Sequence, residues 1–322
     1  MSIPARSFAD WTERYRQQLE ILNFSERTWI TQRSYLRVFQ RFLDELQVQD
    51  LHLITPSRIQ DFQRWLFYQP TTRGLARTVA SQNGALRTVK AFFTFLHTDG
   101  HLPSNPAKEI HYARQPDPLP RNILTVQEAR RIIEAPDVHT LLGYRDRTIL
   151  EVLYATGIRK QELMNLTVDD VNLEEELLRI NAGKGGKDRV VPLSRMACRF
   201  LETYRNAIRP ELLRGATNSR LFISLRARPM GKNTVGAVVE KYARLARVKK
   251  PVTCHLWRHT CATHLLKNHA NLRHVQEILG HRSLATTERY LRLTITDLKE
   301  AHRKHHPREQ FLAKSDGERH TR

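Results

Sequence analysis

Residues 254–269, CHLWRHTCATHLLKNH, gather side chains that can carry a proton or bind an anion or a metal. His255 and Arg258 are three positions apart, so on a helix they share a face. Trp257 and Cys261, four positions apart, point elsewhere and can be buried. A zinc site is poorly supported because no standard finger spacing occurs. The stretch predicts a helix whose histidines either satisfy hydrogen bonds at a surface or form half of an active site.

A second stretch with possible chemistry is LGHRSLATTERY, residues 279–290. Gly280 is expected to end one helix and Ser283 to begin the next, with His281 in the connecting turn and Tyr290 about two turns later. A phenol with a pKa near 10 is a poor nucleophile at neutral pH. Tyr290 is therefore a nucleophile candidate only if positive groups and proton donors converge on it.

Two further stretches supply such groups. In ATGIRKQEL, Arg159 follows Gly157, a predicted helix end, and Glu162 is placed to hold the guanidinium by a charged hydrogen bond. A plain surface ion pair is the alternative. In GKGGKDR, residues 183–189, the spacing does not match a P-loop, and a strand rather than a helix follows. Lys184 there can reach a distant group from the tip of a hairpin.

These motifs are carried by a chain that reads as mainly helical with one small hairpin. The runs EELLRI and RVVPL on either side of NAGKGGKD predict the hairpin. Residues 8–100 predict about four helices. One begins after Ser25, with Ile30, Leu36, Phe39 and Leu43 near one face. Another begins at Thr55-Pro56, and a further helix ends at Gly100.

The later helices are marked by similar signals. A capping-box spacing starts a helix at Thr125, and Gly157 ends the next one. Between the two helical parts, residues 103–120 contain five prolines and few core-forming residues, as a linker does. The sequence thus predicts two domains joined by a linker.

The residues quoted above resemble the tyrosine recombinase (phage-integrase) family, especially its Xer-like and mobile-element branches. The match rests on Arg159, Lys184, His255, Arg258, His281 and Tyr290 in this order, with a hairpin between the first and third. The family often has Leu where this chain has Trp257, a packing change that we expect the fold to absorb.

The resemblance implies a two-domain DNA clamp. Residues 1–102 would form a helical SAM-like core-binding domain, 103–120 the linker, and 121–298 the α+β catalytic domain. The basic tail, 299–322, would be exchanged between protomers. Family members act as four protomers on two double-stranded DNA sites, sometimes with a second recombinase.

The resemblance also implies the chemistry. Tyr290 would attack a DNA phosphodiester to give a 3′-phosphotyrosyl link and a 5′-hydroxyl, without cofactor or metal. Arg159 and Arg258 would bind the phosphate oxygens, with Glu162 as their support. The general acid would be Lys184. The two histidines, His255 and His281, would assist with proton transfer or bind the phosphate.

Composition agrees with a nucleic-acid partner. The net charge is +20, and residues 121–298 carry 31 basic and 18 acidic side chains. No apolar run approaches 18 residues and no signal peptide is evident, so we expect no membrane segment. Three cysteines without CxxC spacing fit reduced thiols and a cytoplasmic protein.

Three alternatives stay open. Type IB topoisomerases and telomere resolvases use the same chemistry, and a recombinase that has lost catalysis could serve as an accessory factor. Within recombinases, the sequence does not separate chromosome-dimer resolution from integration or excision of a mobile element. The length of the chain and its basic tail favour a mobile element.

Overall fold

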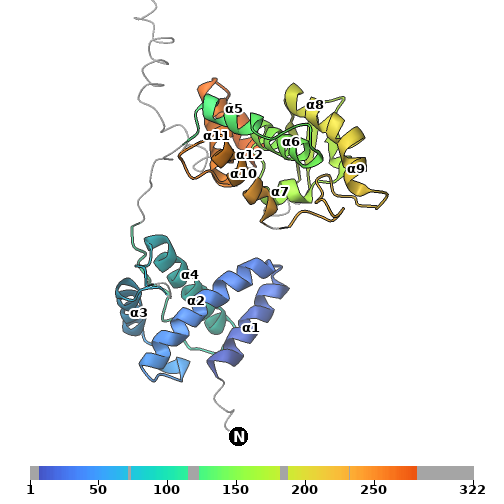
Figure 1. The fold of residues 1–322 in the computed structure, drawn as a ribbon. Coiled ribbons are helices and arrows are strands. Elements are labelled where there is room, and N and C mark those ends of the chain that lie inside the picture. The colour runs from blue at the N-terminus through green and yellow to red at the C-terminus, as the bar shows by residue number, and fades with distance from the viewer. Residues whose placement is uncertain (1–6, 72–73, 115–122, 182–187, 232, 281–322) are drawn as a thin grey trace, which may run out of the picture. The chain divides into compact units, whose positions relative to one another are not determined.

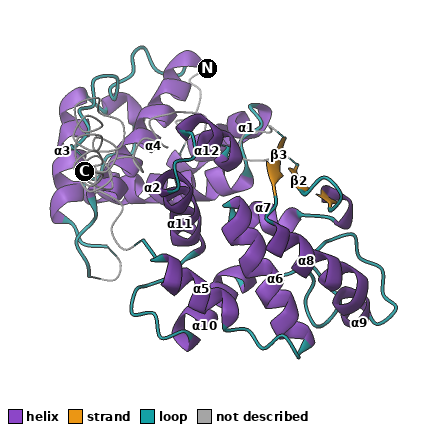
Figure 2. Cartoon of the chain, turned by 90° about the horizontal axis from the view of Figure 1, so that it is seen from above, coloured by secondary structure: helices purple, strands orange, loops and turns teal. Residues whose placement is uncertain are grey.

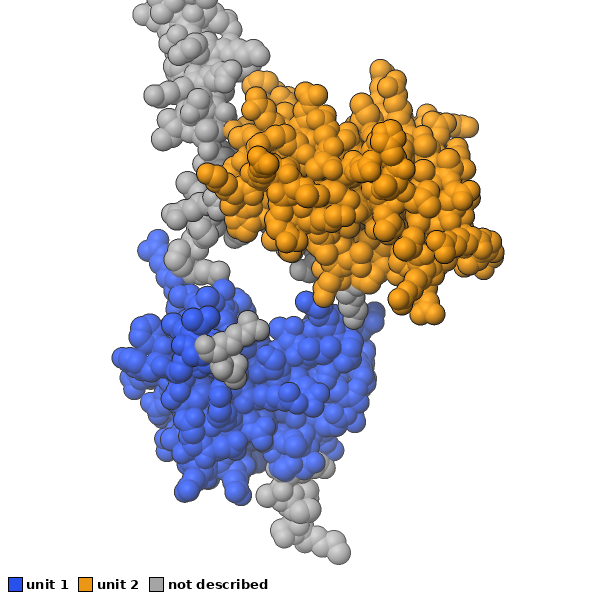
Figure 3. All heavy atoms as spheres, viewed as in Figure 1, with its two compact units in different colours: residues 1–117 blue, residues 118–322 orange. Residues whose placement is uncertain are grey.

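The computed structural model describes residues 7–71, 74–114, 123–181, 188–231 and 233–280. The chain divides into two compact units, residues 1–117 (unit 1) and 118–322 (unit 2), shown in Figure 3. Each unit has a hydrophobic core of its own. The prediction of a mainly helical chain with one small sheet is confirmed. None of the helices in the described ranges is long and apolar enough to cross a bilayer.

Unit 1 is built from helices, seen at the blue end of Figure 1. In chain order they are α1 (Phe8–Ile21), α2 (Glu26–Glu45), the short 3-10 helix η1 (Leu51–Leu53), α3 (Pro56–Tyr68) and α4 (Val79–Thr98). The predicted N-caps are present: the Ser25 hydroxyl accepts from the Thr28 amide, and Thr55 caps α3 ahead of Pro56. The four α-helices expected before Gly100 are therefore confirmed.

Aromatic side chains fill the core of unit 1. The rings of Phe39 and Phe62 meet edge to face at 4.8 Å, and Phe93 lies 5.8 Å from Phe39; all three are fully buried. The prediction that Ile30 shares the buried face of α2 is wrong, since 58% of this residue is exposed. Trp29, one position earlier, is buried instead, because the buried stripe of a helix follows a 3.6-residue period.

Part of the proline-rich segment packs on unit 1. The side-chain amide of Asn83 donates to the Ala113 carbonyl at 2.8 Å, and the Ala113 amide donates back at 3.0 Å. Gln63 donates to the His111 carbonyl at 2.9 Å, and Ala107 is fully buried in the core. Residues 105–113, which the sequence pattern assigns to the linker, are thus held along α3 and α4.

Unit 2 carries the sheet and the remaining helices. Its helices are α5 (Val126–Glu134), α6 (Leu141–Thr156), α7 (Lys160–Asn165), the 3-10 helix η2 (Val168–Asp170), α8 (Arg195–Thr203), a π-helical turn η3 (Tyr204–Ile208), α9 (Arg209–Leu213), α10 (Thr234–Leu245), α11 (Cys254–Lys267) and α12 (Leu272–Leu279). The predicted capping box at Thr125 is present, with Glu128 bonding back to the Thr125 amide at 2.8 Å.

Helix α6 lies at the centre of unit 2. Helices α5, α10 and α11 pack on one side of it and α8 on the other, as Figures 1 and 2 both show. The turn η3 also contacts α6. Ile149, Leu150 and Val152 on α6 are fully buried. Burial on both sides extends to charged residues, and Arg145 and Asp146 are buried as an ion pair at 2.7 Å.

The sheet has three antiparallel strands in the order β1 (Val171–Asn172), β2 (Leu177–Ile180) and β3 (Arg189–Pro192). The predicted hairpin is β2 and β3, which pair from Leu177 opposite Pro192 to Ile180 opposite Arg189. Strand β1 was not predicted, because two residues are too few to produce a recognisable alternation. The sheet positions the hairpin beside α12, which contacts β3.

Gly157 ends α6 as predicted, and its backbone explains why a glycine is needed. Its φ is +58°, and a Cβ there would lie 2.8 Å from Leu279 Cδ2 and 3.2 Å from Cys261 Sγ. Helices α6, α11 and α12 therefore meet closely at this point.

We expect Gly157→Ala to destabilise the protein by roughly 2–4 kcal/mol, because it combines left-handed backbone strain with overpacking. The matched control is Gly236→Ala in α10, where a Cβ meets no atom within 4 Å; there Ala should stabilise by roughly 0.5–1 kcal/mol. Thermal unfolding of both variants measures the effects. Equal melting temperatures for the two variants would contradict the close approach at Gly157.

Candidate active site

Arg159 and Glu162 form the predicted pair at the start of α7. The Arg159 Nη1 donates to Glu162 Oε1 at 2.8 Å, and the Arg159 backbone amide donates to Glu162 Oε2, also at 2.8 Å. The second bond is the return half of a capping box, which places an acidic residue at the positive end of the helix. Glu162 thus holds both the backbone and the guanidinium of Arg159.

Glu162 also binds a second arginine. Arg189, the first residue of β3, donates from Nη2 to Oε2 at 2.8 Å and from Nη1 to Oε1 at 3.1 Å, a bidentate contact. The Glu162 side chain is only 6% exposed. Burial alone would raise its pKa, but hydrogen bonds from Arg189 and Arg159 outweigh that effect and lower the pKa to about 2. Glu162 is ionised throughout the physiological range.

Arg258 lies in the interior of unit 2, on the second turn of α11. Its Nη1 donates to the Gly157 carbonyl at 2.8 Å, and its Nη2 donates to the Leu279 carbonyl. The residue is only 6% exposed. Arg258 therefore connects the end of α6 with the end of α12.

Three consecutive carbonyls at the end of α12 accept hydrogen bonds from arginines. Arg189 Nε donates to Ile278 at 3.1 Å, Arg258 to Leu279, and Arg159 Nη2 to Gly280 at 3.3 Å. We call Arg159, Arg189 and Arg258 the arginine cluster. The last carbonyls of a helix lack partners within it and carry its negative dipole end, so they attract cations.

The arginine cluster makes this part of unit 2 suited to binding an anion. Three guanidinium groups from α7, β3 and α11 converge on one helix end, and planar guanidiniums bind phosphate with two parallel hydrogen bonds. The Arg159 side chain is more accessible than that of Arg189, with 25% exposed against 13%. Guanidinium groups are chemically suited to an oxyanion and not to a metal ion, because they are donors only.

Other residues of the 254–269 stretch are either exposed at the surface or buried in unit 2. His255 lies in the first turn of α11 and is exposed. His264 is buried: its Nε2 donates to the Leu124 carbonyl at 2.9 Å, which leaves Nδ1 to accept from the Tyr154 hydroxyl at 2.7 Å. Trp257 is fully buried, as expected for a packing residue, and meets the Tyr154 ring edge to face at 6.1 Å.

Burial also affects the cysteine candidates for metal binding. Cys261 lies inside unit 2, where burial raises its thiol pKa to about 12. A thiol with this pKa is a poor metal ligand, because the thiolate is the binding form. Within the described ranges, no three His, Cys, Asp or Glu side chains are grouped so that they could hold a metal ion.

Three predicted site residues, Lys184, His281 and Tyr290, lie outside the described residues. Their neighbours along the chain are described. Ile180 and Arg189 pair where the hairpin containing Lys184 leaves the sheet. Gly280, which precedes His281, ends α12 with φ +63° as predicted.

Arg189 was not singled out from the sequence. Its position in GKGGKDR marks only the beginning of a strand, and nothing in the local spacing links it to Glu162, which lies 27 residues earlier. One signal was available: if Glu162 is buried, its carboxylate needs enough hydrogen-bond donors to stay charged, so a second basic residue beside it could have been expected.

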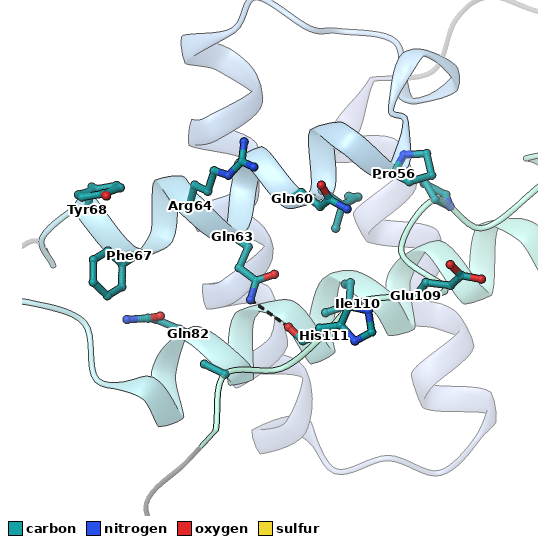
Figure 4. Close-up of a pocket in the computed structure, with 13 residues that line it drawn as sticks. Pro56, Gln60, Gln63, Arg64, Phe67, Tyr68, Gln82, Glu109, Ile110 and His111 are labelled. Carbon is teal, nitrogen blue, oxygen red and sulfur yellow. Dashed lines mark hydrogen bonds between the residues drawn. The ribbon is translucent and has the colours of Figure 1, made fainter.

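Unit 1 has a hollow of its own, of about 560 Å³, shown in Figure 4. Residues of α3 and of the segment held along it line this hollow, and the hydrogen bond from Gln63 to the His111 carbonyl joins the two. Phe67 and Tyr68 at its edge are well exposed. Arg64 is the one arginine among its described lining residues, so the hollow offers much less positive charge than the arginine cluster.

We expect the contribution of Glu162 to depend on pH. Its pKa is lowered to about 2 in the folded protein from 4.5 unfolded, so its stabilisation is complete above about pH 4.5 and is lost as the pH falls toward 2. Calorimetry should find Glu162→Gln less stable by about 3 kcal/mol at pH 7, with the gap shrinking on acidification. Glu134→Gln, an exposed partner of Arg130, is the control. A gap that stays constant down to pH 3 would contradict this account.

Comparison with known proteins identifies the family to which the chain belongs. The family model described as phage integrase family matches residues 122–296. Tyrosine recombinase XerC 2 of Ralstonia nicotianae is 36% identical over 307 residues, covering 94% of this chain and 88% of the relative.

Two solved structures share the fold. The XerH site-specific recombinase bound to palindromic difH substrate, a post-cleavage complex, has a TM-score of 0.70 at 23% identity, covering 87% of this chain and 80% of that one. A lambda integrase tetramer bound to a Holliday junction has a TM-score of 0.67 at 21% identity, covering 90% and 78%. The family match and the XerC relative show that the chain is a tyrosine recombinase of the phage integrase family, whose activity is site-specific DNA recombination.

Proposed function

We propose that this recombinase cuts and rejoins double-stranded DNA with Tyr290 as its nucleophile and the arginine cluster as its phosphate site. The observation that carries the proposal is the convergence of Arg159 and Arg258 on the end of α12. The chain continues from this point directly into His281 and, nine residues later, Tyr290. A nucleophile on this segment would be tethered close to the bound phosphate.

Positive charge is what the reaction needs most. As the tyrosine oxygen attacks phosphorus, negative charge develops on the nonbridging oxygens of a pentavalent transition state. Donors that are already oriented stabilise this charge without reorganising, and the loss of one commonly costs about 10²–10³ in rate. Arg159 and Arg258 enter the reaction already held by carbonyls, so they fit this role.

Protons must move at both ends of the reaction. The tyrosine gives up its proton as it attacks, and the departing 5′-oxygen takes one to become a hydroxyl. We assign the second step to Lys184 on the hairpin. We assign His255 and His281 to the tyrosine proton or to the phosphate, because imidazoles exchange protons near neutral pH.

The proposed chemistry needs no cofactor. The energy of the broken phosphodiester is kept in the 3′-phosphotyrosyl bond, and attack by a 5′-hydroxyl from another strand restores the DNA backbone. No divalent cation is required, because guanidinium groups provide the positive charge that a metal supplies in other phosphoryl-transfer enzymes.

Recombination between two sites requires several protomers, and we propose four. A tetramer is the form of the lambda integrase complex that shares this fold. We further propose that the tail, residues 299–322, is exchanged between neighbouring protomers; it lies outside the described residues. The unpaired thiols of Cys198, Cys254 and Cys261 suit a reducing, cytoplasmic setting.

Helix α2 offers a surface for DNA phosphates. Arg33, Arg37 and Arg41 are exposed and spaced by four residues, so they form one stripe along the helix. On α10, Lys241 and Arg244 are also exposed. Nine of the 20 residues of α4 are buried, whereas the arginine stripe of α2 is exposed along its length, so we propose that α2 supplies much of the DNA contact in unit 1.

The cellular role that we favour is integration or excision of a mobile element. This preference rests on the basic character of residues 299–322. Chromosome-dimer resolution is the alternative, and the partner requirement differs between them: a second recombinase acting on the same site would favour resolution.

The central test is covalent trapping in EDTA on nicked duplexes that tile the DNA flanking the gene. Because the nick lets the cleaved fragment diffuse away, religation is blocked and a denaturation-resistant adduct should accumulate. Tyr290→Phe should abolish the adduct while leaving DNA affinity within about threefold, since it removes only the attacking oxygen.

Each other outcome counts against the proposal. An adduct that persists in Tyr290→Phe would place the nucleophile elsewhere. Cleavage that requires added magnesium would indicate a metal-dependent nuclease. Tight binding without an adduct on any duplex would favour an accessory factor, and relaxation of a plasmid lacking any bound site would favour a topoisomerase.

Salt dependence tests the α2 stripe. Replacing Arg33 and Arg37 together by Gln should weaken DNA binding and reduce the slope of log affinity against log salt by about two, one for each phosphate that the variant no longer neutralises. Arg16→Gln on α1, where Glu13 and Glu20 flank the arginine, is the matched control. An unchanged slope in the double variant would rule out this surface.

A further inference from the structure

Arg189 contacts two parts of the active site at once. Its Nη atoms hold both oxygens of Glu162, and its Nε donates to the Ile278 carbonyl in the last turn of α12. The two Nη atoms of the guanidinium therefore face Glu162, and its Nε faces α12. Arg189 thus joins β3, α7 and α12.

The packing around Arg189 is tight. A Cβ added to Gly280 would lie 3.0 Å from Arg189 Nε and 3.1 Å from its Cδ and Cζ. The side chain is 13% exposed. Gly280 must therefore be a glycine for two reasons, its φ of +63° and the guanidinium stacked against it.

Glu162 depends on two arginines to keep a fixed orientation. One of its oxygens, Oε1, binds both Arg159 Nη1 and Arg189 Nη1, and the other binds the Arg159 amide and Arg189 Nη2. Without Arg189 the carboxylate would lose half of these donors and could rotate about its own χ angles. The Arg159 guanidinium would then lose its fixed direction.

We propose that Arg189 is a positioning residue for DNA cleavage: it holds Glu162 and the last turn of α12 so that Arg159 presents its guanidinium to the scissile phosphate. This inference rests on the proposed function. Arg189 itself does not need to touch DNA. Its effect on the rate passes through Arg159 and the α12 end.

A competing interpretation assigns Arg189 to the hairpin. Arg189 begins β3 opposite Ile180, at the base of the loop that contains Lys184. A residue there could act by placing the lysine. The side-chain contacts favour the positioning role, because within the described part of the chain the Arg189 guanidinium donates to Glu162 and α12.

The experiment compares single-turnover cleavage rates at saturating protein for Arg189→Gln and Arg189→Lys. Arg189→Gln should slow cleavage by about 10- to 100-fold, because small displacements of an oriented group have effects of this size. Arg189→Lys should recover only part, since an ammonium cannot make the bidentate contact. DNA affinity should stay within about threefold in both.

Arg179→Gln is the matched control on the neighbouring strand. Arg179 lies on β2, is largely exposed and reaches Asp170 at 3.4 Å. It should leave cleavage unchanged. All rates are measured at least 15 °C below each variant's melting temperature. At that distance the free energy of unfolding is still on the order of several kcal/mol, so unfolded protein does not contribute to the rate.

A modified substrate separates the two interpretations of Arg189. When sulfur replaces the bridging 5′-oxygen at the scissile phosphate, the leaving group is a thiolate, whose conjugate acid has a pKa of about 8.5, so it departs without a proton. Lys184→Ala should recover its rate on this DNA. Arg189→Gln should keep its full defect, because the phosphate still needs its positive charge.

The outcomes are distinct. If wild type forms no adduct, the proposed function fails. If wild type cleaves and Arg189→Gln cleaves equally fast, the positioning role is wrong. Recovery of the Arg189→Gln rate on the sulfur substrate would overturn the positioning role in favour of the hairpin interpretation. A loss of DNA affinity as large as the loss of rate would also overturn it and would indicate that Arg189 is only a structural residue.

Discussion

The candidate active site of this recombinase depends on the carbonyl end of one short helix. The eight-residue helix α12 ends with carbonyls that have no partner within the helix. Arg189, Arg258 and Arg159 donate to three consecutive carbonyls there, those of residues 278, 279 and 280. Each arginine comes from a different part of unit 2, so the helix end is where these parts meet. The rest of the site is arranged around that meeting point.

Glycines and one carboxylate make the arrangement possible. Gly157 lets α6, α11 and α12 approach closely, and its carbonyl receives Arg258. Gly280 ends α12 in a left-handed conformation with Arg189 against it. Glu162 is buried beside two of the arginines and stays ionised because they donate to it. Packing and electrostatics thus act on the same few atoms.

Local signals predicted much of this structure. N-caps at Ser25 and Thr125 and helix ends at Gly157 and Gly280 depend on the backbone within one turn, so the sequence identified them. The Arg159–Glu162 hydrogen bond was predicted for the same reason, since the two residues are three apart. The burial of Ile30 was mispredicted because adjacent residues compete for the same stripe of a helix.

Contacts between distant segments could not be predicted. Arg189 lies 89 residues before the carbonyl to which it donates, and no local pattern encodes that separation. The same is true of residues 105–113, which looked like part of a linker because the segment 103–120 contains five prolines and few core-forming residues. Their two-way hydrogen bond with Asn83 depends on the tertiary fold.

The use of carbonyls in the arginine cluster has a consequence for how the enzyme meets its substrate. A carbonyl is a neutral dipole, so the carbonyls of Gly157 and Leu279 orient Arg258 without cancelling its charge. The Glu162 carboxylate, in contrast, partly offsets the charges of Arg159 and Arg189. The helix end therefore acts as a weak stand-in for the phosphate. Under the proposed function, a DNA phosphodiester with its full negative charge would meet guanidinium groups that are already oriented by oxygen atoms.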